Sequence, residues 1–406
     1  MSGRGRHVLF VYDGLPPHRK GGAETRLGAI ARGLAGRGWR VSWIGLAPRQ
    51  APREQHLGGI LYRKIGTEPG ARRTGRRGLL SQLGYCARLW RCELPGDVDC
   101  LVVGQMPWLH FFVIRRRIPA RIPMLVDCWE IWGSSWTAYY GSILGFFGRR
   151  VERRVVRKAD MVVSLSGPTR QGLLGHGVEP GRILDAPNGV DLDLADRIEV
   201  ARNPLEVVYF GRLVPHKNVA LLIAAFREVA GALPEAVLTV IGDGGERPAL
   251  EALADRLGLA GRVRFLGAIG DHAEALARLK AASICVQPST SEGGGSVAVH
   301  EANACGLPVV ALRHPQGIDP ALIVEGVNGF WLDEAAPGPL ARLLIGLLED
   351  RPLLERLRRS SREAVAHLDW SHTIDSFDAA LSRLAGSASM GAHAPGAADL
   401  QPATSG

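Results

Sequence analysis

Short runs of consecutive apolar residues recur along the first half of the chain. The runs are Val8–Tyr12, Arg40–Gly45, Cys100–Val103, Met124–Val126 and Met161–Leu165. Helical or irregular segments separate them, such as the helical pattern that follows the first run. The strands of a parallel sheet read as continuous apolar runs, because helices bury both faces of the sheet. The pattern therefore predicts a doubly wound, Rossmann-like α/β domain over residues 1–188.

The same alternation restarts at Asn203-Pro204. The expected strands and helices are Glu206–Phe210, Val219–Ala230, Ala236–Ile241, Arg247–Leu257, Val263–Leu266, Ala273–Ala281, Ile284–Pro288, Val297–Cys305 and Pro308–Leu312. A chain of 406 residues exceeds the roughly 250–300 residues at which one hydrophobic core stops growing. We therefore expect a second α/β domain over residues 189–369. Ligands of open α/β sheets bind at the carboxyl ends of the strands, so the expected site is the cleft between the domains.

No segment reads as a signal for export or for membrane insertion. The N-terminus lacks the apolar part of a secretory signal, and the mostly apolar stretch Leu101–Ile114 is shorter than the ~18–20 residues of a membrane-spanning helix. The six cysteines form no C-x-x-C pair, which fits a reducing compartment. We expect a cytoplasmic protein. Residues 386–406, rich in Ala, Gly, Pro and Ser, are expected to be a disordered tail.

Charge is distributed unevenly along the chain. Residues 1–186 hold 30 Lys and Arg against 13 Asp and Glu, whereas the remainder is net acidic. Two interpretations remain open: the first half faces an anionic partner, or high-GC codon usage favours arginine. Binding of nucleic acid is not expected, because the chain shows neither a helix-turn-helix signature nor an aromatic platform for single strands.

Trp132–Lys158 combines aromatic residues with a basic end. Such a segment can form an amphipathic helix that lies on an anionic membrane, which would place the protein at the inner face of the membrane. The same pattern also fits an ordinary helix that covers the first sheet and turns its arginines to solvent. Both interpretations stay open at this point.

Two loops of the second domain carry candidate chemistry. Arg212 and Lys217 lie five residues apart on the loop after a predicted strand, where two cations can neutralise a diphosphate. In Ser291–Val310, glycines precede a helix, and backbone N–H groups at such a place can bind a phosphate or sugar oxygen. Solvated loop cations and a plain tight turn are the alternative readings.

Several further segments occur in a fixed order. They are Lys20-Gly21-Gly22-Ala23-Glu24, Val162-Val163-Ser164-Leu165-Ser166, Pro187-Asn188-Gly189-Val190-Asp191, Val240-Ile241-Gly242-Asp243-Gly244-Gly245-Glu246 and Val324-Glu325-Gly326-Val327-Asn328-Gly329-Phe330. With the two loops above, this ordered set resembles the retaining glycosyltransferases of the GT-B fold known as glycosyltransferase family four. The resemblance spans roughly residues 8–385. It implies two Rossmann-like domains facing a central cleft, with a helix over 370–385 that packs back on the first domain.

The resemblance also implies roles for individual residues. Arg212 and Lys217 match the pair that binds the donor's diphosphate, and Gly21-Gly22 matches the glycine turn that approaches it from the first domain. Glu301 matches the acid that binds the ribose hydroxyls, and Glu292 matches the acid near the transferred sugar. Backbone groups of Gly294, Gly295 and Ser296 are expected to share that contact.

The sequence departs from the family pattern in two places. Glu292 and Glu301 are separated by eight residues instead of seven, which makes the role of Glu292 less secure than that of Glu301. The family often has a histidine at the end of a first-domain strand near the reacting sugar. Here we expect Asp127, or Glu130, to face the acceptor, with His110 as an alternative that also reads as a structural residue.

The implied function is retaining transfer of a sugar from a UDP- or GDP-sugar to a hydroxyl acceptor. The acceptor would be a glycan, a lipid-linked molecule or a small natural product, and the Arg-rich segment Leu46–Gly84 is expected to contact it. A nucleotide-sugar epimerase of the same fold is the alternative. No metal or other cofactor is expected, because Asp97-Val98-Asp99 and Asp191-Leu192-Asp193 read as structural and the two cations supply positive charge.

Overall fold

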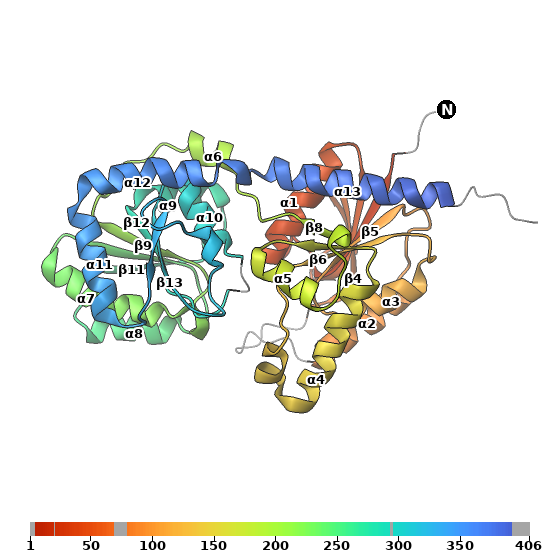
Figure 1. Ribbon diagram of the computed structural model, residues 1–406, viewed down its shortest axis with the longest axis horizontal. Coiled ribbons are helices and arrows are strands. Elements are labelled where there is room, and N and C mark those ends of the chain that lie inside the picture. The colour runs from red at the N-terminus through yellow and green to blue at the C-terminus, as the bar shows by residue number, and fades with distance from the viewer. Residues whose placement is uncertain (1–4, 20, 69–78, 293–294, 392–406) are drawn as a thin grey trace, which may run out of the picture.

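The computed structural model describes residues 5–19, 21–68, 79–292 and 295–391. Two α/β domains lie side by side, and one long C-terminal helix reaches from the second domain across the first (Figure 1). Both sheets are doubly wound, with helices on each face. The predicted fold class is confirmed.

The first domain contains an eight-stranded sheet in the order β3-β4-β2-β1-β5-β6-β7-β8, parallel except for β3. The strands are β1 (His7–Gly14), β2 (Arg40–Ala47), β3 (Glu54–Leu57), β4 (Ile60–Thr67), β5 (Cys100–Gly104), β6 (Met124–Cys128), β7 (Met161–Ser164) and β8 (Ile183–Asp185). The helices are α1 (Gly22–Gly36), α2 (Leu79–Arg91), α3 (His110–Arg117), α4 (Ser135–Lys158), α5 (Gly167–Gly175) and the 3₁₀ turn η1 (Pro180–Arg182). The segment 46–84 thus contains β3 and β4, whereas its residues 69–78 lie outside the described part.

Alternation along β1 divides the core of this domain between the two faces of the sheet. Val8 and Phe10 pack into the cluster that contains α1, whereas Leu9 and Val11 pack into the cluster that contains α3 and α4. All four side chains are fully buried. Successive side chains of a strand point to opposite faces, so the apolar run Val8–Val11 requires cover on both sides of the sheet.

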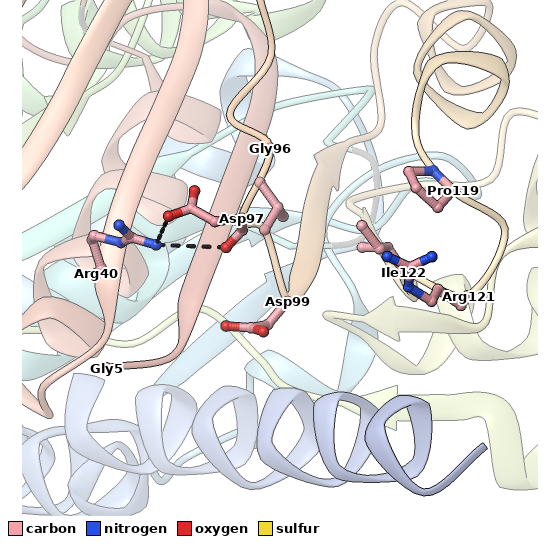
Figure 2. A pocket seen from close by; sticks show the side chains of 9 residues that line it. Gly5, Arg40, Gly96, Asp97, Asp99, Pro119, Arg121 and Ile122 are labelled. Atoms are coloured by element: carbon pink, nitrogen blue, oxygen red, sulfur yellow. Dashed lines mark hydrogen bonds and ion pairs between the residues drawn. The ribbon is translucent and has the colours of Figure 1, made fainter. Parts of the chain in front are cut away.

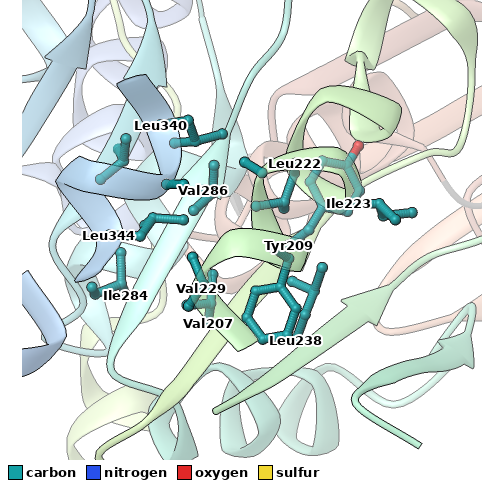
Figure 3. Close-up of a cluster of buried hydrophobic side chains, with 14 of the residues drawn as sticks. Val207, Tyr209, Leu222, Ile223, Val229, Leu238, Ile284, Val286, Leu340 and Leu344 are labelled. Atoms are coloured by element: carbon teal, nitrogen blue, oxygen red, sulfur yellow. The ribbon is translucent and has the colours of Figure 1, made fainter. Parts of the chain in front are cut away.

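The second domain contains a six-stranded parallel sheet in the order β11-β10-β9-β12-β13-β14. The strands are β9 (Glu206–Phe210), β10 (Val237–Ile241), β11 (Val263–Gly267), β12 (Ile284–Gln287), β13 (Val309–Leu312) and β14 (Gly329–Leu332). The helices are α6 (Leu192–Arg197), α7 (Val219–Ala232), α8 (Arg247–Arg256), α9 (His272–Ala281), α10 (Val297–Ala304), α11 (Pro337–Glu349) and α12 (Arg351–Ala364), with the 3₁₀ turns η2 (Pro215–Lys217), η3 (Pro320–Leu322) and η4 (Ala366–Leu368). Figure 3 shows how Val207, Tyr209 and Val286 of the strands meet Leu222 of α7 and Leu340 of α11.

The chain passes between the domains twice, and the two passages lie side by side. Val190 donates its N–H to Leu368 O at 2.8 Å, and Trp370 donates to Val190 O at 3.3 Å. Gly189 is required here, because a Cβ at this position would lie 2.5 Å from the Trp370 ring. The two adjacent segments form a narrow hinge about which the domains can rotate relative to each other.

Helix α13 (Trp370–Gly391) completes the core of the first domain. Phe377 and Leu381 are fully buried in the same cluster as α1, and Ile374 lies so close to Gly33 of α1 that a Cβ there would be 2.3 Å away. The helix includes residues 386–391, which we expected to belong to the tail. Ala, Ser and Met are compatible with a helix, and the remainder of the expected tail lies outside the described residues.

Candidate donor site at the strand ends

The loop after β9 holds Arg212 and Lys217 at the carboxyl end of the second sheet. Gly211 has a φ of 154°, and Gly242 of the neighbouring loop lies against it, where a Cβ would be 1.8 Å from Gly211 O. The Tyr209 hydroxyl donates to Arg212 O at 2.9 Å. Two glycines and one buried tyrosine therefore fix the path of the loop that carries both cations.

Lys217 and Glu292 form an ion pair between Nζ and Oε1. The two loops are also joined through their backbones, since Thr290 donates its N–H to His216 O at 2.8 Å. Glu292 donates its N–H to Gln316 O, in the loop after β13, at 3.0 Å. The lysine and the acid are largely buried, whereas Arg212 is exposed. The structure thus brings together the expected diphosphate-binding lysine and the expected sugar-binding acid.

The same loop carries His216. Burial lowers the pKa of His216, and the neighbouring cations Lys217 and Arg212 lower it further, while Glu292 acts in the opposite direction. The ring is therefore neutral at neutral pH, and the positive charge of the loop is concentrated on Arg212 and Lys217. Two fixed cations at the end of a parallel strand are suited to an anionic ligand.

Helix α10 directs its N-terminus at the first domain. A Cβ at Gly295 would lie 2.2 Å from Leu165 Cδ1, and Ser296 is the N-cap residue and is buried. Gly294 lies outside the described residues. The exposed N–H groups of a first helical turn attract anions, which fits the expected contact of Gly295 and Ser296 with the donor.

Glu301 lies one turn further along α10. It is 8% exposed, and burial raises the pKa of its carboxyl to about 8. His272 is the nearest ionisable partner, with Nδ1 at 3.8 Å from Oε1. A buried carboxyl with so little compensation is suited to accept hydrogen bonds from hydroxyl groups of a ligand.

The first domain contributes the turn before α1. Gly21 is the N-cap of α1, and a Cβ there would lie 2.6 Å from Glu24 Oε2. Glu24 is buried and pairs with Arg19 through Nε at 3.0 Å. A Cβ on Gly22, in contrast, would meet no atom within 4 Å. Gly22 thus leaves space beside the first turn of α1, but the Glu24 carboxylate already lies against Gly21. Lys20 lies outside the described residues.

Asp127 lies at the carboxyl end of β6 but is fully buried. Its carboxylate accepts from Arg26 Nε at 3.0 Å and from Trp129 Nε1 at 2.9 Å. Arg26 also donates to Ala186 O, Pro187 O and Asn188 Oδ1, at 2.8, 3.0 and 3.2 Å. Asp127 thus fixes the connection between the domains, and its carboxylate does not face open space.

Sequence reasoning missed Arg26, although it lies beside Leu27 and Ile30 on the apolar face of α1, where a charged residue is unusual.

Glu130, the other residue expected to face the acceptor, lies nearer to the donor loops. Burial raises the pKa of its carboxyl, the Trp132 Nε1 hydrogen bond at 2.5 Å lowers it, and Glu152 and Glu292 raise it. Glu292 is thus an electrostatic neighbour across the domains.

His110 lies instead in the first-domain core, where Nδ1 contacts Pro107 O and the ring lies 6.0 Å from Tyr85. Its placement is that of a structural residue.

Direct contacts between the domains lie close to these loops. Gly167 donates its N–H to Asp319 Oδ2 at 3.2 Å, and Gln316 Nε2 donates to Ser135 Oγ at 3.4 Å. Gln316 O is also the acceptor for Glu292 N–H. The described donor loops therefore lie directly opposite α5 and the start of α4.

The two Asp-x-Asp segments have other partners. Asp191 caps α6 by accepting from Leu194 N at 2.9 Å. Asp97 accepts from Arg40 at 2.5 Å and contacts His7 Nδ1 at 3.1 Å, beside a pocket of about 320 Å³ (Figure 2). That pocket lies at the amino ends of β1, β2 and β5, on the opposite edge of the sheet from the residues that contact the second domain.

Among the described residues no group of His, Cys, Asp and Glu has the arrangement of a metal site, and no described helix combines the length and apolarity needed to cross a membrane.

The sequence matches two family models. Residues 21–189 match the glycosyl transferase 4-like domain, and residues 194–364 match glycosyl transferases group 1. D-inositol 3-phosphate glycosyltransferase of Geodermatophilus obscurus is 35% identical over 254 residues, which is 58% of this chain and 55% of that protein. The matched region spans about half the length of the curated relatives.

Solved structures agree with this assignment of the fold. Sucrose-phosphate synthase from Thermosynechococcus elongatus has a TM-score of 0.77 at 20% identity, covering 94% of this chain and 100% of that one. The Anabaena protein HepE in complex with UDP-glucose has a TM-score of 0.71 at 21% identity, covering 93% and 99%. With both domains matched in order, the chain belongs to the GT-B glycosyltransferases of the family-four type.

Proposed function

We propose that the protein transfers a sugar from a UDP- or GDP-sugar to a hydroxyl acceptor and retains the configuration of the anomeric carbon. The observation that carries this proposal is the ion pair of Lys217 with Glu292, on the loops of the second domain that face the first. The complex of HepE with UDP-glucose favours UDP as the nucleotide. The acceptor is a hydroxyl compound bound by the first domain.

The ion pair suggests how a donor enters. A diphosphate beside Arg212 and Lys217 would take the place of Glu292 as the partner of the ammonium group, because it carries more negative charge. Glu292 would then be free to accept hydrogen bonds from the sugar hydroxyls. Glu301 would accept from the ribose hydroxyls, which suits its buried carboxyl.

The proposed reaction needs no strongly basic side chain. The bond between the anomeric carbon and the diphosphate oxygen breaks, while a bond between that carbon and the acceptor oxygen forms on the same face. The acceptor's proton passes to the leaving diphosphate oxygen. Arg212 and Lys217 stabilise the negative charge that develops on the leaving group, which is the electrostatic work that commonly dominates catalysis.

The donor site is tested by thermal unfolding with UDP-, GDP-, ADP- and dTDP-sugars, with and without EDTA. A ligand at 100 times its dissociation constant adds about 2.7 kcal/mol to the free energy of unfolding. We expect one nucleotide class to stabilise the protein in EDTA as well, and the Arg212→Ala/Lys217→Ala variant to lose the effect. Arg256→Ala, on the exposed side of α8, is the matched control.

The reaction itself is tested by product analysis with the stabilising donor. A transferase releases the nucleoside diphosphate and yields a glycosylated acceptor with retained configuration. Interconversion of the donor sugar without an acceptor would instead identify an epimerase. A protein that no nucleotide stabilises would contradict the proposal.

A further inference from the structure

Helix α4 projects from the first domain as a bent hairpin (Figure 1). Gly141, with a φ of 77°, interrupts the helical backbone and separates a short arm, residues 135–140, from a long arm, residues 142–158. Only glycine adopts this conformation without strain. The chain therefore turns at this residue.

Glycines also hold the two arms together. A Cβ at Gly145 would lie 2.5 Å from Thr137 Cα, and a Cβ at Gly148 would lie 2.3 Å from Trp136 Cε3. At the base, the fully buried Glu152 accepts from Trp132 N, Gly133 N and Trp136 Nε1 at 3.0, 3.1 and 2.9 Å. The hairpin is thus a packed unit whose orientation is fixed by the first domain.

The glycine face turns inward, and the large apolar residues turn outward. Ile143, Leu144, Phe146 and Phe147 are 75%, 52%, 54% and 59% exposed. They are four of the eleven large apolar side chains that are exposed among the described residues, and all four lie within the five positions 143–147. We call residues 143–147 the tip. Water-exposed apolar groups gathered in this way mark a surface that another phase or molecule covers.

Basic residues follow the tip on the long arm. Arg149, Arg150, Arg153, Arg154, Arg157 and Lys158 are exposed, and Glu152, the only carboxylate between residues 135 and 158, is buried. At about 100° per residue, Arg150 and Arg154 share the face of the tip residues. Arg150 also lies over the Phe146 ring, 5.2 Å from its centre.

We propose that the tip inserts into the surface of an anionic lipid bilayer and that these basic residues bind the lipid phosphates. Amphipathic elements bury their apolar groups about 5–10 Å deep, at the boundary of headgroups and acyl chains. At 1.5 Å per residue, Arg149 and Arg150 lie about 5 Å from Phe146 and Phe147 along the helix, at the level of the phosphates. Arg153 and Arg154 lie about 10 Å away, within the screening length at physiological salt.

The hairpin also connects this surface to the cleft. Trp132 donates to Glu130, and Ser135 accepts from Gln316, whose carbonyl holds Glu292. The short arm between these contacts and the tip spans only about 9 Å. If the proposed transfer reaction holds, a docked protein would meet an acceptor that is carried by a lipid. The docking itself does not depend on that reaction.

Vesicle co-sedimentation of the full chain, without nucleotide, tests the docking. We expect at least about tenfold tighter binding to vesicles of equal phosphatidylglycerol and phosphatidylcholine than to phosphatidylcholine alone, weakened by salt. Phe146→Ser/Phe147→Ser and Arg149→Gln/Arg150→Gln should each weaken that binding by at least about tenfold. Val324→Ser/Val327→Ser and Arg256→Gln/Arg359→Gln, at exposed positions of the second domain, are the matched controls and should bind like the unmodified chain.

The Phe146/Phe147 and Arg149/Arg150 variants are first shown to keep the unfolding temperature of the unmodified chain and its stabilisation by the nucleotide. This control shows that a loss of vesicle binding comes neither from misfolding nor from a loss of donor binding. Equal binding to neutral and anionic vesicles, or tip variants that bind like the controls, would overturn the proposal. The proposal would also be overturned if the protein bound no vesicles but self-associated through the tip. Self-association would be detected as a molecular mass in solution above that of the monomer, which falls in the Phe146→Ser/Phe147→Ser variant.

Discussion

Glu301 is held in an uncharged form at neutral pH, because burial raises its pKa from 4.5 to about 8. The folded state then binds a proton that the unfolded state releases, so folding loses stability as pH rises from 4.5 towards 8. Glu301→Gln removes this effect. We expect the variant to gain on the order of 1–3 kcal/mol in the free energy of unfolding near pH 7, measured by urea denaturation.

The same substitution should weaken binding of the donor. Hydrogen bonds from the ribose hydroxyls would stabilise the ionised form of Glu301 in the complex, and a neutral amide accepts weaker hydrogen bonds than that carboxylate does. The expected loss is about tenfold in the dissociation constant. The opposing effects on stability and affinity are diagnostic of a residue kept for ligand binding. A Glu301→Gln protein that is more stable and binds nucleotide unchanged would remove Glu301 from the donor site.

The sequence suggests some single residues of the site, but not the distant residues with which they interact. Arg212, Lys217 and Glu301 could be proposed as site residues because each lies in a short motif. The structure places Arg212 and Lys217 on the segment after β9, and Glu301 in the second turn of α10. The ion pair of Lys217 with Glu292 could not be predicted, because 75 positions separate the partners. The partner of Asp127 is Arg26, which is 101 positions away.

At the scale of elements, the Arg26–Asp127 pair joins α1 to β6 and to residues 186–188. Both side chains are almost fully buried, so removing one partner leaves a buried charge. Arg26→Ala or Asp127→Ala should each cost about 3–5 kcal/mol, and the double variant should cost less than the sum. Urea denaturation of the four proteins measures this.

The same series tests the alternative role of Asp127. If this residue acts on the acceptor, Asp127→Asn should retain most of its stability and lose activity. If it fixes the connection between the domains, stability and activity should change together. Glu130→Gln is the comparison, since Glu130 lies nearer to Glu292.

Elements were predictable where their burial is uniform. Strands β1, β5 and β6 are buried along their length, and they contain the apolar runs Val8–Tyr12, Cys100–Val103 and Met124–Val126. Strand β4 was not predicted, because it is only partly buried and contains Arg63, Lys64 and Gly66. The turn within α4 was also missed, since Gly141 resembles any other helical glycine until its backbone conformation is known.

At the scale of the whole molecule, stability should depend on pH through two neighbouring residues with opposite effects. Burial lowers the pKa of His300 from 6.5 to about 4, so its contribution is present above pH 6.5 and is lost as pH falls towards 4. Glu301 acts in the other direction between 4.5 and 8. We expect His300→Gln to reduce the loss of stability between pH 6.5 and 4, measured by urea denaturation across that range.

The effects of His300 and Glu301 can be distinguished by the pH range in which each changes the free energy of unfolding. Between pH 6.5 and 8 only the Glu301 effect remains of the two, so Glu301→Gln should flatten the profile there while His300→Gln leaves it unchanged. A His300→Gln protein as acid-sensitive as the unmodified chain would show that other groups, such as buried carboxylates in ion pairs, control acid unfolding.

The position of α13 has a consequence for how the chain is made. Phe377 and Leu381 complete the core of the first domain but are among the last described residues of the chain. A ribosome adds about 5–20 residues per second, so roughly 10–40 s separate synthesis of the first sheet from synthesis of the helix that covers it. During that interval the second domain is synthesised, whereas the first waits with the part of its apolar core that α13 covers still exposed. The domain made first is therefore completed last.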